Sequence, residues 1–68
     1  MIVTVNGQRR ELDTGATVAT VVALLDVAPD ARGVAVALDG EVVSRSRWSR
    51  TPVGDGAQLE VLSAIGGG

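Results

Sequence analysis

The chain has no cysteine, no histidine and no lysine, and Trp48 is its only aromatic residue. The lack of cysteine excludes disulfides, thiolate metal sites and a cysteine nucleophile. The lack of histidine removes the other usual zinc ligand and the commonest general base. Only carboxylates, arginines and hydroxyls remain for chemistry on the folded body. We therefore expect a protein that is not an enzyme and that binds no metal and no cofactor of its own.

The charge balance and the apolar runs exclude two further classes of partner. Six arginines and eight acidic residues give a net charge of −2, which offers no basic field for phosphates, so nucleic-acid binding is not expected. No apolar run approaches the roughly 20 residues that span a bilayer, and the N-terminus shows no basic region followed by an apolar stretch. We expect no membrane partner and a cytoplasmic location.

The chain length limits the size of the core. Sixty-eight residues, 46% of them hydrophobic, predict one small domain. At this size, folding buries only about 60% of the surface that the unfolded chain exposes. A deep pocket is therefore not expected.

Two hairpins are predicted, one early in the chain and one in its second half. Residues 1–5 are rich in β-formers and lead to Asn6-Gly7, the strongest short hairpin signal, after which residues 9–13 return with Leu12 pointing inward. Residues 34–38 alternate large and small apolar side chains and lead to Asp39-Gly40. Residues 41–43 then form a short returning strand.

One helix and one last strand complete the predicted order. Val18, Val21, Val22 and Leu25 follow the spacing of a helical stripe, with Thr17 as N-cap, and Pro29 and Gly33 end the helical region. Residues 44–50 are polar apart from Trp48. Turn residues follow, and residues 57–62 form the last strand.

This order predicts two layers, with the helix covering one face of a mixed sheet. The predicted core consists of Val3, Val5, Leu12, Val18, Val21, Val22, Leu25, Val34, Val36, Leu38, Leu59 and Val61. The order resembles the α+β fold called β-grasp, or ubiquitin-like, in which four or five strands pack on one helix. In that fold the last strand lies inside the sheet and continues as a free tail. We accordingly expect a domain over residues 1–63 and a flexible tail over residues 64–68.

The three terminal glycines are the strongest functional signal. Glycine has no Cβ, so Gly66 and Gly67 can thread a narrow channel, and Gly68 presents its carboxylate with no side chain beside it. That carboxylate is the candidate functional group. The same glycines are equally typical of a frayed terminus or a linker.

Several segments together resemble the ThiS family, the sulfur carrier proteins of thiamine biosynthesis. The resemblance covers the whole chain. It includes the opening strand before Asn6-Gly7, the helix start at Gly15-Ala16-Thr17-Val18, the segment from Val36 to Trp48, and the terminal glycines. Each element is moderately specific, and the ordered set is highly specific.

The resemblance implies a defined chemistry for the tail. An E1-like adenylyltransferase of the ThiF type would use ATP and Mg²⁺ to convert the Gly68 carboxylate to an acyl adenylate, with Gly66 and Gly67 in its active site. Sulfur from a donor protein would then give a thiocarboxylate, which a thiazole synthase of the ThiG type would consume. Three alternatives stay open: the small subunit of molybdopterin synthase, a ubiquitin-like modifier joined to lysines of targets, and a passive interaction domain.

Strand alternation predicts where such partners dock. Ala35, Ala37 and Leu62 fall on the sheet face opposite the helix, with Ala64 and Ile65 leading from it into the tail. Flat apolar patches of this kind often mark partner sites.

The arginines around Trp48 allow two interpretations. Arg45, Arg47 and Arg50 could form a phosphate or partner-docking cluster. Alternatively, Trp48 closes an open end of the small core while the arginines are solvated or paired with acids. We favour the second interpretation.

Overall fold

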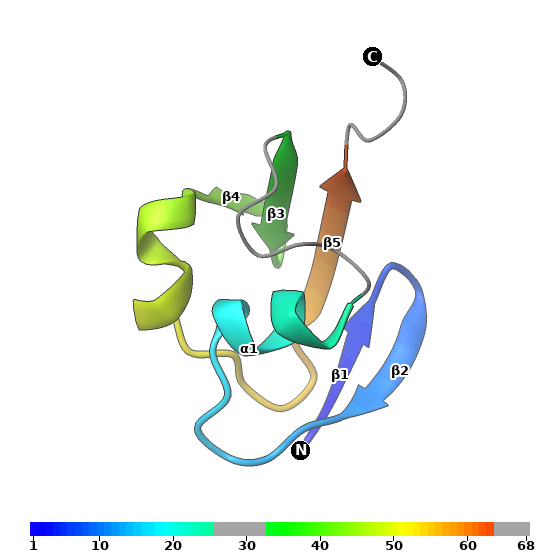
Figure 1. Cartoon of the computed structure of the whole chain (residues 1–68). Helices are drawn as coiled ribbons and strands as arrows, with labels where there is room; N and C mark the ends of the chain where they lie inside the picture. Colours follow the sequence, from blue (N-terminus) through cyan, green and yellow to red (C-terminus); the bar gives the residue numbers. More distant parts are fainter. Residues whose placement is uncertain (26–32, 64–68) are drawn as a thin grey trace.

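The computed structural model describes residues 1–25 and 33–63. Both predicted hairpins are present and form the two sides of one sheet (Figure 1). Their strands are β1 (Ile2–Val5) with β2 (Gln8–Glu11), and β3 (Val34–Leu38) with β4 (Glu41–Val43). The second strand is thus shorter than the predicted 9–13, and Leu12 is buried just beyond its end.

The hairpin turns follow from their sequences. Asn6 and Asp39 both have φ of 50°, and the glycines after them have φ of 81° at Gly7 and 89° at Gly40. Two successive residues with positive φ define the type I′ turn, whose twist matches that of the flanking strands. Asparagine and aspartate tolerate this left-handed region better than other side chains, and glycine adopts it freely.

The last strand, β5 (Gln58–Ser63), joins the two hairpins. The strand order is β2-β1-β5-β3-β4, with β5 parallel to β1 and antiparallel to β3. The chain therefore has the predicted mixed sheet, with its last strand at the centre. This is the β-grasp arrangement expected from the order of the elements.

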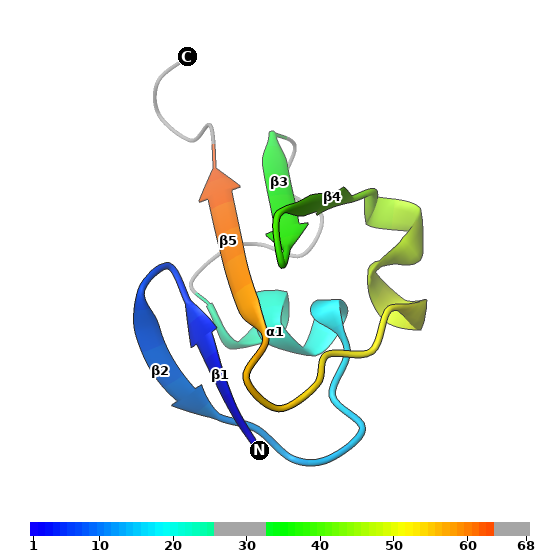
Figure 2. The ribbon, with the colours of Figure 1, turned by 180° about the vertical axis from the view of Figure 1, so that it is seen from behind.

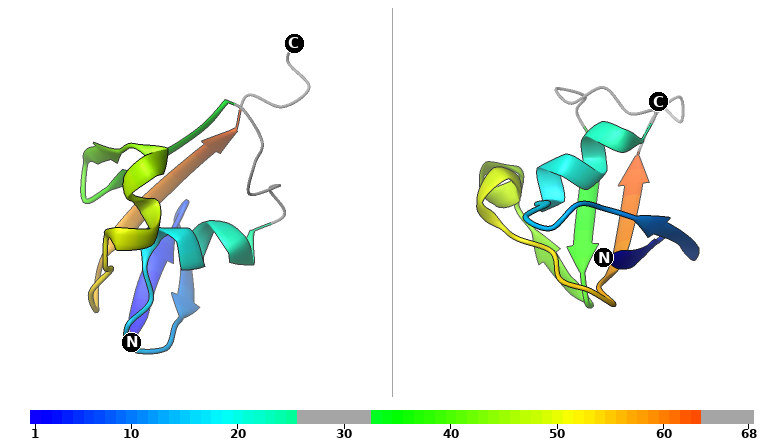
Figure 3. Two further views of the ribbon diagram at one scale, coloured as in Figure 1. Left: turned by 60° about the vertical axis from the view of Figure 1, so that its left-hand side comes forward. Right: turned by 90° about the horizontal axis from the view of Figure 1, so that it is seen from below.

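The helix α1 (Val18–Leu24) crosses one face of the sheet (Figure 3). Thr17 caps it as predicted: its Oγ1 accepts from the Thr20 N–H at 3.4 Å, and Thr20 Oγ1 accepts from the Thr17 N–H at 3.0 Å. The helix ends at Leu24 because Leu25 is already extended, well before the predicted stop at Pro29 and Gly33. Residues 26–32 lie outside the described part of the chain. None of the described helices is long and apolar enough to cross a membrane.

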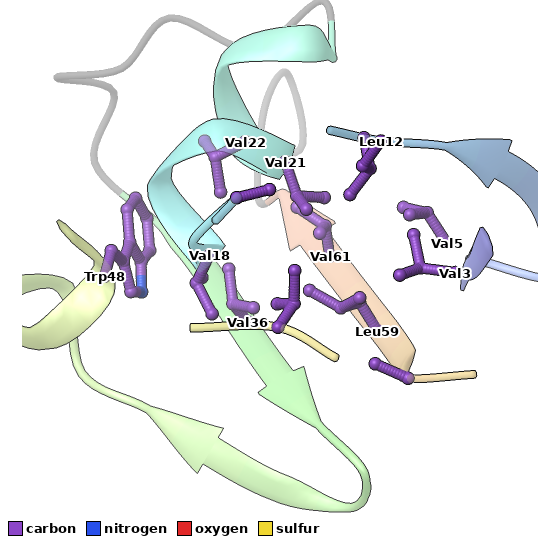
Figure 4. Close-up of a cluster of buried hydrophobic side chains, with 13 residues drawn as sticks. Val3, Val5, Leu12, Val18, Val21, Val22, Val36, Trp48, Leu59 and Val61 are labelled. Carbon is purple, nitrogen blue, oxygen red and sulfur yellow. The ribbon is translucent and has the colours of Figure 1, made fainter. Parts of the chain in front are cut away.

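A 3₁₀ helix that the sequence did not predict, η1 (Arg45–Arg50), follows β4. Its spacing of three residues per turn directs Trp48 inward against α1, where the side chain is 6% exposed (Figure 4). The indole Nε1 donates to the Val43 carbonyl at 2.9 Å, so the buried polar atom is satisfied. The prediction that Trp48 closes one end of the core is confirmed.

The core agrees with the prediction in its centre and differs at its edges. Nine of the twelve predicted residues are buried. Leu25, Val34 and Leu38 are only partly buried and pack against its margin, because they lie at the ends of their elements. The buried set also includes Ala16 and Val53 from loops that carry no periodic pattern, and Ala57, which precedes β5 and alternates with Leu59 and Val61.

Candidate functional site

The strand β5 leads to the candidate carboxylate and ends at Ser63. Residues 64–68 lie outside the described residues, so Ala64, Ile65 and the three glycines are known here from the sequence alone. An extended chain covers at most about 3.3–3.6 Å per residue. The five residues after Ser63 can therefore place the Gly68 carboxylate no more than about 18 Å from the end of the strand.

Asp39 and Asn6, one from each hairpin turn, form hydrogen bonds with β5. At its beginning, the Gln58 N–H donates to Asp39 Oδ1 at 2.9 Å, and the Asp39 N–H donates to the Gln58 carbonyl at 2.8 Å. Further along, the Val61 N–H donates to Asn6 Oδ1 at 2.8 Å, and Asn6 Nδ2 donates to the Val61 carbonyl at 3.1 Å. The strand that carries the tail is thus held on both sides along most of its length.

Three of the predicted docking residues, Ala35, Ala37 and Leu62, lie together on the sheet face that α1 leaves uncovered, which Figure 2 shows from that side. Leu62 is 65% exposed and lies opposite Ala35, which is also exposed. Ala37 is half-buried on the same face, and its partner on β4 is Val42, which is 80% exposed. We call Ala35, Ala37, Val42 and Leu62 the apolar shelf.

The sequence analysis missed Val42. The signal was present, because a two-residue turn at Asp39-Gly40 fixes the hairpin register and places Val42 opposite Ala37. The structure therefore extends the predicted patch to the edge strand. Whether the shelf docks a partner stays a prediction.

A polar hollow, formed by residues of β1, the first hairpin turn and β5, lies next to the apolar shelf. It has a volume of about 470 Å³ and is lined by Thr4, Asn6, Gly7, Gln58, Leu59 and Glu60. It lies where the end of β1 and the first hairpin turn run beside the beginning of β5, with Thr4 paired to Gln58. Its lining places oxygen acceptors beside an apolar surface.

Among the arginines near Trp48, Arg45 contacts the indole ring. The Arg45 guanidinium lies 5.2 Å from the centroid of the Trp48 ring, which is the geometry of a cation–π contact. This contact supports a structural role for the pair. Residues 1–25 and 33–63 include no group of three histidines, cysteines, aspartates or glutamates that could hold a metal ion.

Comparisons with known proteins match this chain to one family and to solved structures of thiamine biosynthesis proteins. A family model described as the ThiS family matches residues 3–68. The crystal structure of the thiamine biosynthesis protein ThiS from Geobacter metallireducens superposes with a TM-score of 0.77 at 38% identity, covering 100% of both chains. A solution structure of a thiamine biosynthesis protein from the same organism gives a TM-score of 0.78 at 38% identity, covering 100% of this chain and 88% of that one.

A curated relative is much longer. It is named thiazole synthase, comes from Paramagnetospirillum magneticum, and is 37% identical over 68 residues. The match covers 100% of this chain but only 20% of the length of the relative.

Proposed function

The chain belongs to the ThiS family, and on that premise we propose that it carries sulfur on the carboxylate of Gly68 for thiazole formation in thiamine biosynthesis. The observation that carries the proposal is the extent of the family match, which runs to residue 68 and so includes the three glycines. The fold supports it, because β5 is the central strand of the sheet and leads directly to the tail.

The chemistry begins by making a poor electrophile reactive. The Gly68 carboxylate attacks the α-phosphorus of ATP in an E1-like enzyme, which forms an acyl adenylate and releases pyrophosphate. Hydrosulfide then adds to the acyl carbon, displaces AMP and loses its proton, which leaves a thiocarboxylate. The activating partner holds ATP and Mg²⁺ and supplies the positioning and the stabilisation of charge in the transition state. The carrier contributes the reacting group and its placement.

Thiazole synthase is the proposed acceptor of the sulfur. The relative from Paramagnetospirillum magneticum bears that name, and one fifth of its length corresponds to this chain. That relative combines a segment similar to this chain with the name of the acceptor enzyme. This combination supports direct binding between the sulfur carrier and thiazole synthase. The apolar shelf is the proposed docking surface for the activating enzyme, with Ala64 and Ile65 continuing it toward the tail.

Intact-mass spectrometry tests the proposal. The purified chain is incubated with the E1-like enzyme, ATP, Mg²⁺ and sulfide, after the starting mass has established that Gly68 carries a free carboxylate. We expect a mass gain equal to the exchange of one oxygen for one sulfur. A chain that lacks residues 64–68 is the control and should gain nothing.

Two other results would point to different functions. Attachment of the chain to other proteins would identify a ubiquitin-like modifier. Transfer of the sulfur to a pterin precursor, and not to thiazole synthase, would identify a molybdopterin synthase subunit. A chain that gains no sulfur contradicts the carrier proposal.

A further inference from the structure

The carboxylate of Glu60 borders the apolar shelf on the sheet face that α1 leaves uncovered. Glu60 is exposed on β5, directly opposite Ala37, and Val42 continues the same row on the edge strand. Leu62 lies two residues further along β5, so it shares the face with Glu60. The carboxylate therefore has members of the apolar shelf on two sides.

The polar hollow lies on the remaining side of Glu60. Glu60 is the only charged residue among those lining it. The Asn6 side chain is already engaged by the Val61 backbone, whereas the Thr4 hydroxyl and the Gln58 side-chain carbonyl offer oxygen acceptors. The hollow thus combines one negative charge with neutral acceptors.

The chain does not neutralise this carboxylate within the described residues. No hydrogen bond or ion pair there involves the Glu60 side chain. The register places Arg9 on the same face, but opposite Thr4 on the edge strand. Two strand spacings and two residues separate the positions of Arg9 and Glu60, which corresponds to roughly 12 Å between their Cα atoms.

Any protein that covers the shelf must also cover Glu60, because Val42, Ala37 and Glu60 form one continuous row. An unpaired carboxylate under an apolar surface is strongly unfavourable, since it loses its hydration without compensation. We infer that the partner docking on this face inserts an arginine side chain into the polar hollow, where it pairs with Glu60. A guanidinium suits the site because its several N–H groups can donate to the carboxylate and to the neighbouring oxygens together.

This inference rests on the proposed function for the identity of the partner, which is the activating enzyme. Its test is the dissociation constant of the full-length carrier and the E1-like enzyme, measured by calorimetry at low and at high salt. Glu60→Gln removes the charge and keeps the shape, and Glu60→Arg reverses the charge. Glu11→Gln is the matched control, because Glu11 is exposed on the same face but lies on the edge strand opposite Ile2.

We expect Glu60→Gln to weaken binding at least about 30-fold, Glu60→Arg to weaken it further, and Glu11→Gln to change it less than about twofold. The effect of Glu60→Gln should shrink as salt increases. Equal losses for Glu60→Gln and Glu11→Gln would reveal a long-range charge effect and overturn the pairing. An unchanged or tighter constant for Glu60→Gln would overturn it too.

Two further measurements distinguish a failure of this inference from a failure of the proposed function. Leu62→Asp reports on the docking face: if it also leaves binding unchanged, the enzyme does not use this face and the inference fails. The mass assay on the unmodified chain reports independently on sulfur loading. Because Glu60 is exposed, its variants should keep the circular dichroism and the thermal midpoint of the parent protein.

Discussion

The Asn6 side chain takes the place of β1 beside Val61. The strand β1 ends at Val5, yet the N–H and the carbonyl of Val61 both find partners in the Asn6 amide, at 2.8 and 3.1 Å. One side chain thus extends the hydrogen bonding along β5 from Leu59, the last residue paired with β1, to Val61, two residues further on. The turn that reverses the first hairpin thereby also holds the strand that leads to the tail.

Two substitutions at Asn6 separate hydrogen bonding from backbone strain. Asn6→Gly removes both bonds but accepts the φ of 50°, so it should lower the free energy of unfolding by about 1–2 kcal/mol. Asn6→Ala should cost about 1 kcal/mol more, because alanine disfavours the left-handed region. Urea unfolding followed by Trp48 fluorescence measures both. If Asn6→Gly is as stable as the parent, the two bonds contribute nothing.

Trp48 should be essential to a domain of this size. Trp48→Ala removes a buried ring and should cost about 3–5 kcal/mol, against a total stability of about 3–10 kcal/mol for 68 residues. Trp48→Phe retains a ring but leaves the Val43 carbonyl without its donor, so a loss of about 1–2 kcal/mol is expected. Circular dichroism during thermal unfolding checks both variants, since each removes the fluorophore. Similar losses for the two would show that the hydrogen bond matters more than the volume.

Two glycines in one loop should respond oppositely to alanine. At both Gly54 and Gly56, an added Cβ meets no atom within 4 Å, but only Gly56 has a positive φ, at 83°. Gly56→Ala should therefore lower stability by about 1 kcal/mol through backbone strain alone. Gly54→Ala should raise it by about 0.4–1 kcal/mol by restricting the unfolded chain. The denaturation midpoints of the two variants measure these changes. Equal shifts for Gly54→Ala and Gly56→Ala would contradict the idea that the positive φ of Gly56 makes the difference.

Leu62 should be dispensable for folding but needed for docking. Because Leu62 is 65% exposed, Leu62→Asp should change the free energy of unfolding by no more than about 0.5 kcal/mol. Its affinity for the activating enzyme should fall about tenfold or more, since burying a leucine contributes about 1.5–3 kcal/mol. Leu24→Asp is the matched control: Leu24 is 52% exposed on α1, which covers the other face. Calorimetric titration of both variants should separate them, and equal weakening would argue against a specific shelf.

The reach of the tail should limit the reaction. Deleting Gly68 leaves a chemically equivalent carboxylate on Gly67 but withdraws it by up to about 3.5 Å. A misplacement of about 1 Å can cost on the order of 100-fold in rate, so adenylation should fall sharply. One residue added after Gly68 should have a similar effect, whereas an N-terminal tag should be tolerated. Equal rates of adenylate formation for the full and shortened chains would make the third glycine dispensable.

Local chemistry in the sequence determined most of the architecture. Asn6-Gly7 and Asp39-Gly40 specify type I′ turns by themselves, and Thr17 with the apolar spacing after it specifies where α1 begins. These signals act over a few residues, so they can be read without knowing the fold. The terminal glycines and the ordered motifs likewise identified the family, and the alternation along β3 and β5 placed Ala35, Ala37 and Leu62 on one face.

Only the tertiary structure decided the features that depend on contacts between distant segments. Ala16 and Val53 are buried because their loops run alongside each other, where the Val53 N–H donates to the Ala16 carbonyl at 3.0 Å. The reach of Asn6 to Val61 spans 55 positions and follows from the parallel pairing of β1 and β5. The placement of Glu60 beside the shelf depends equally on which strands are neighbours. Periodicity predicts which face a residue occupies, but only strand order and register decide what lies next to it.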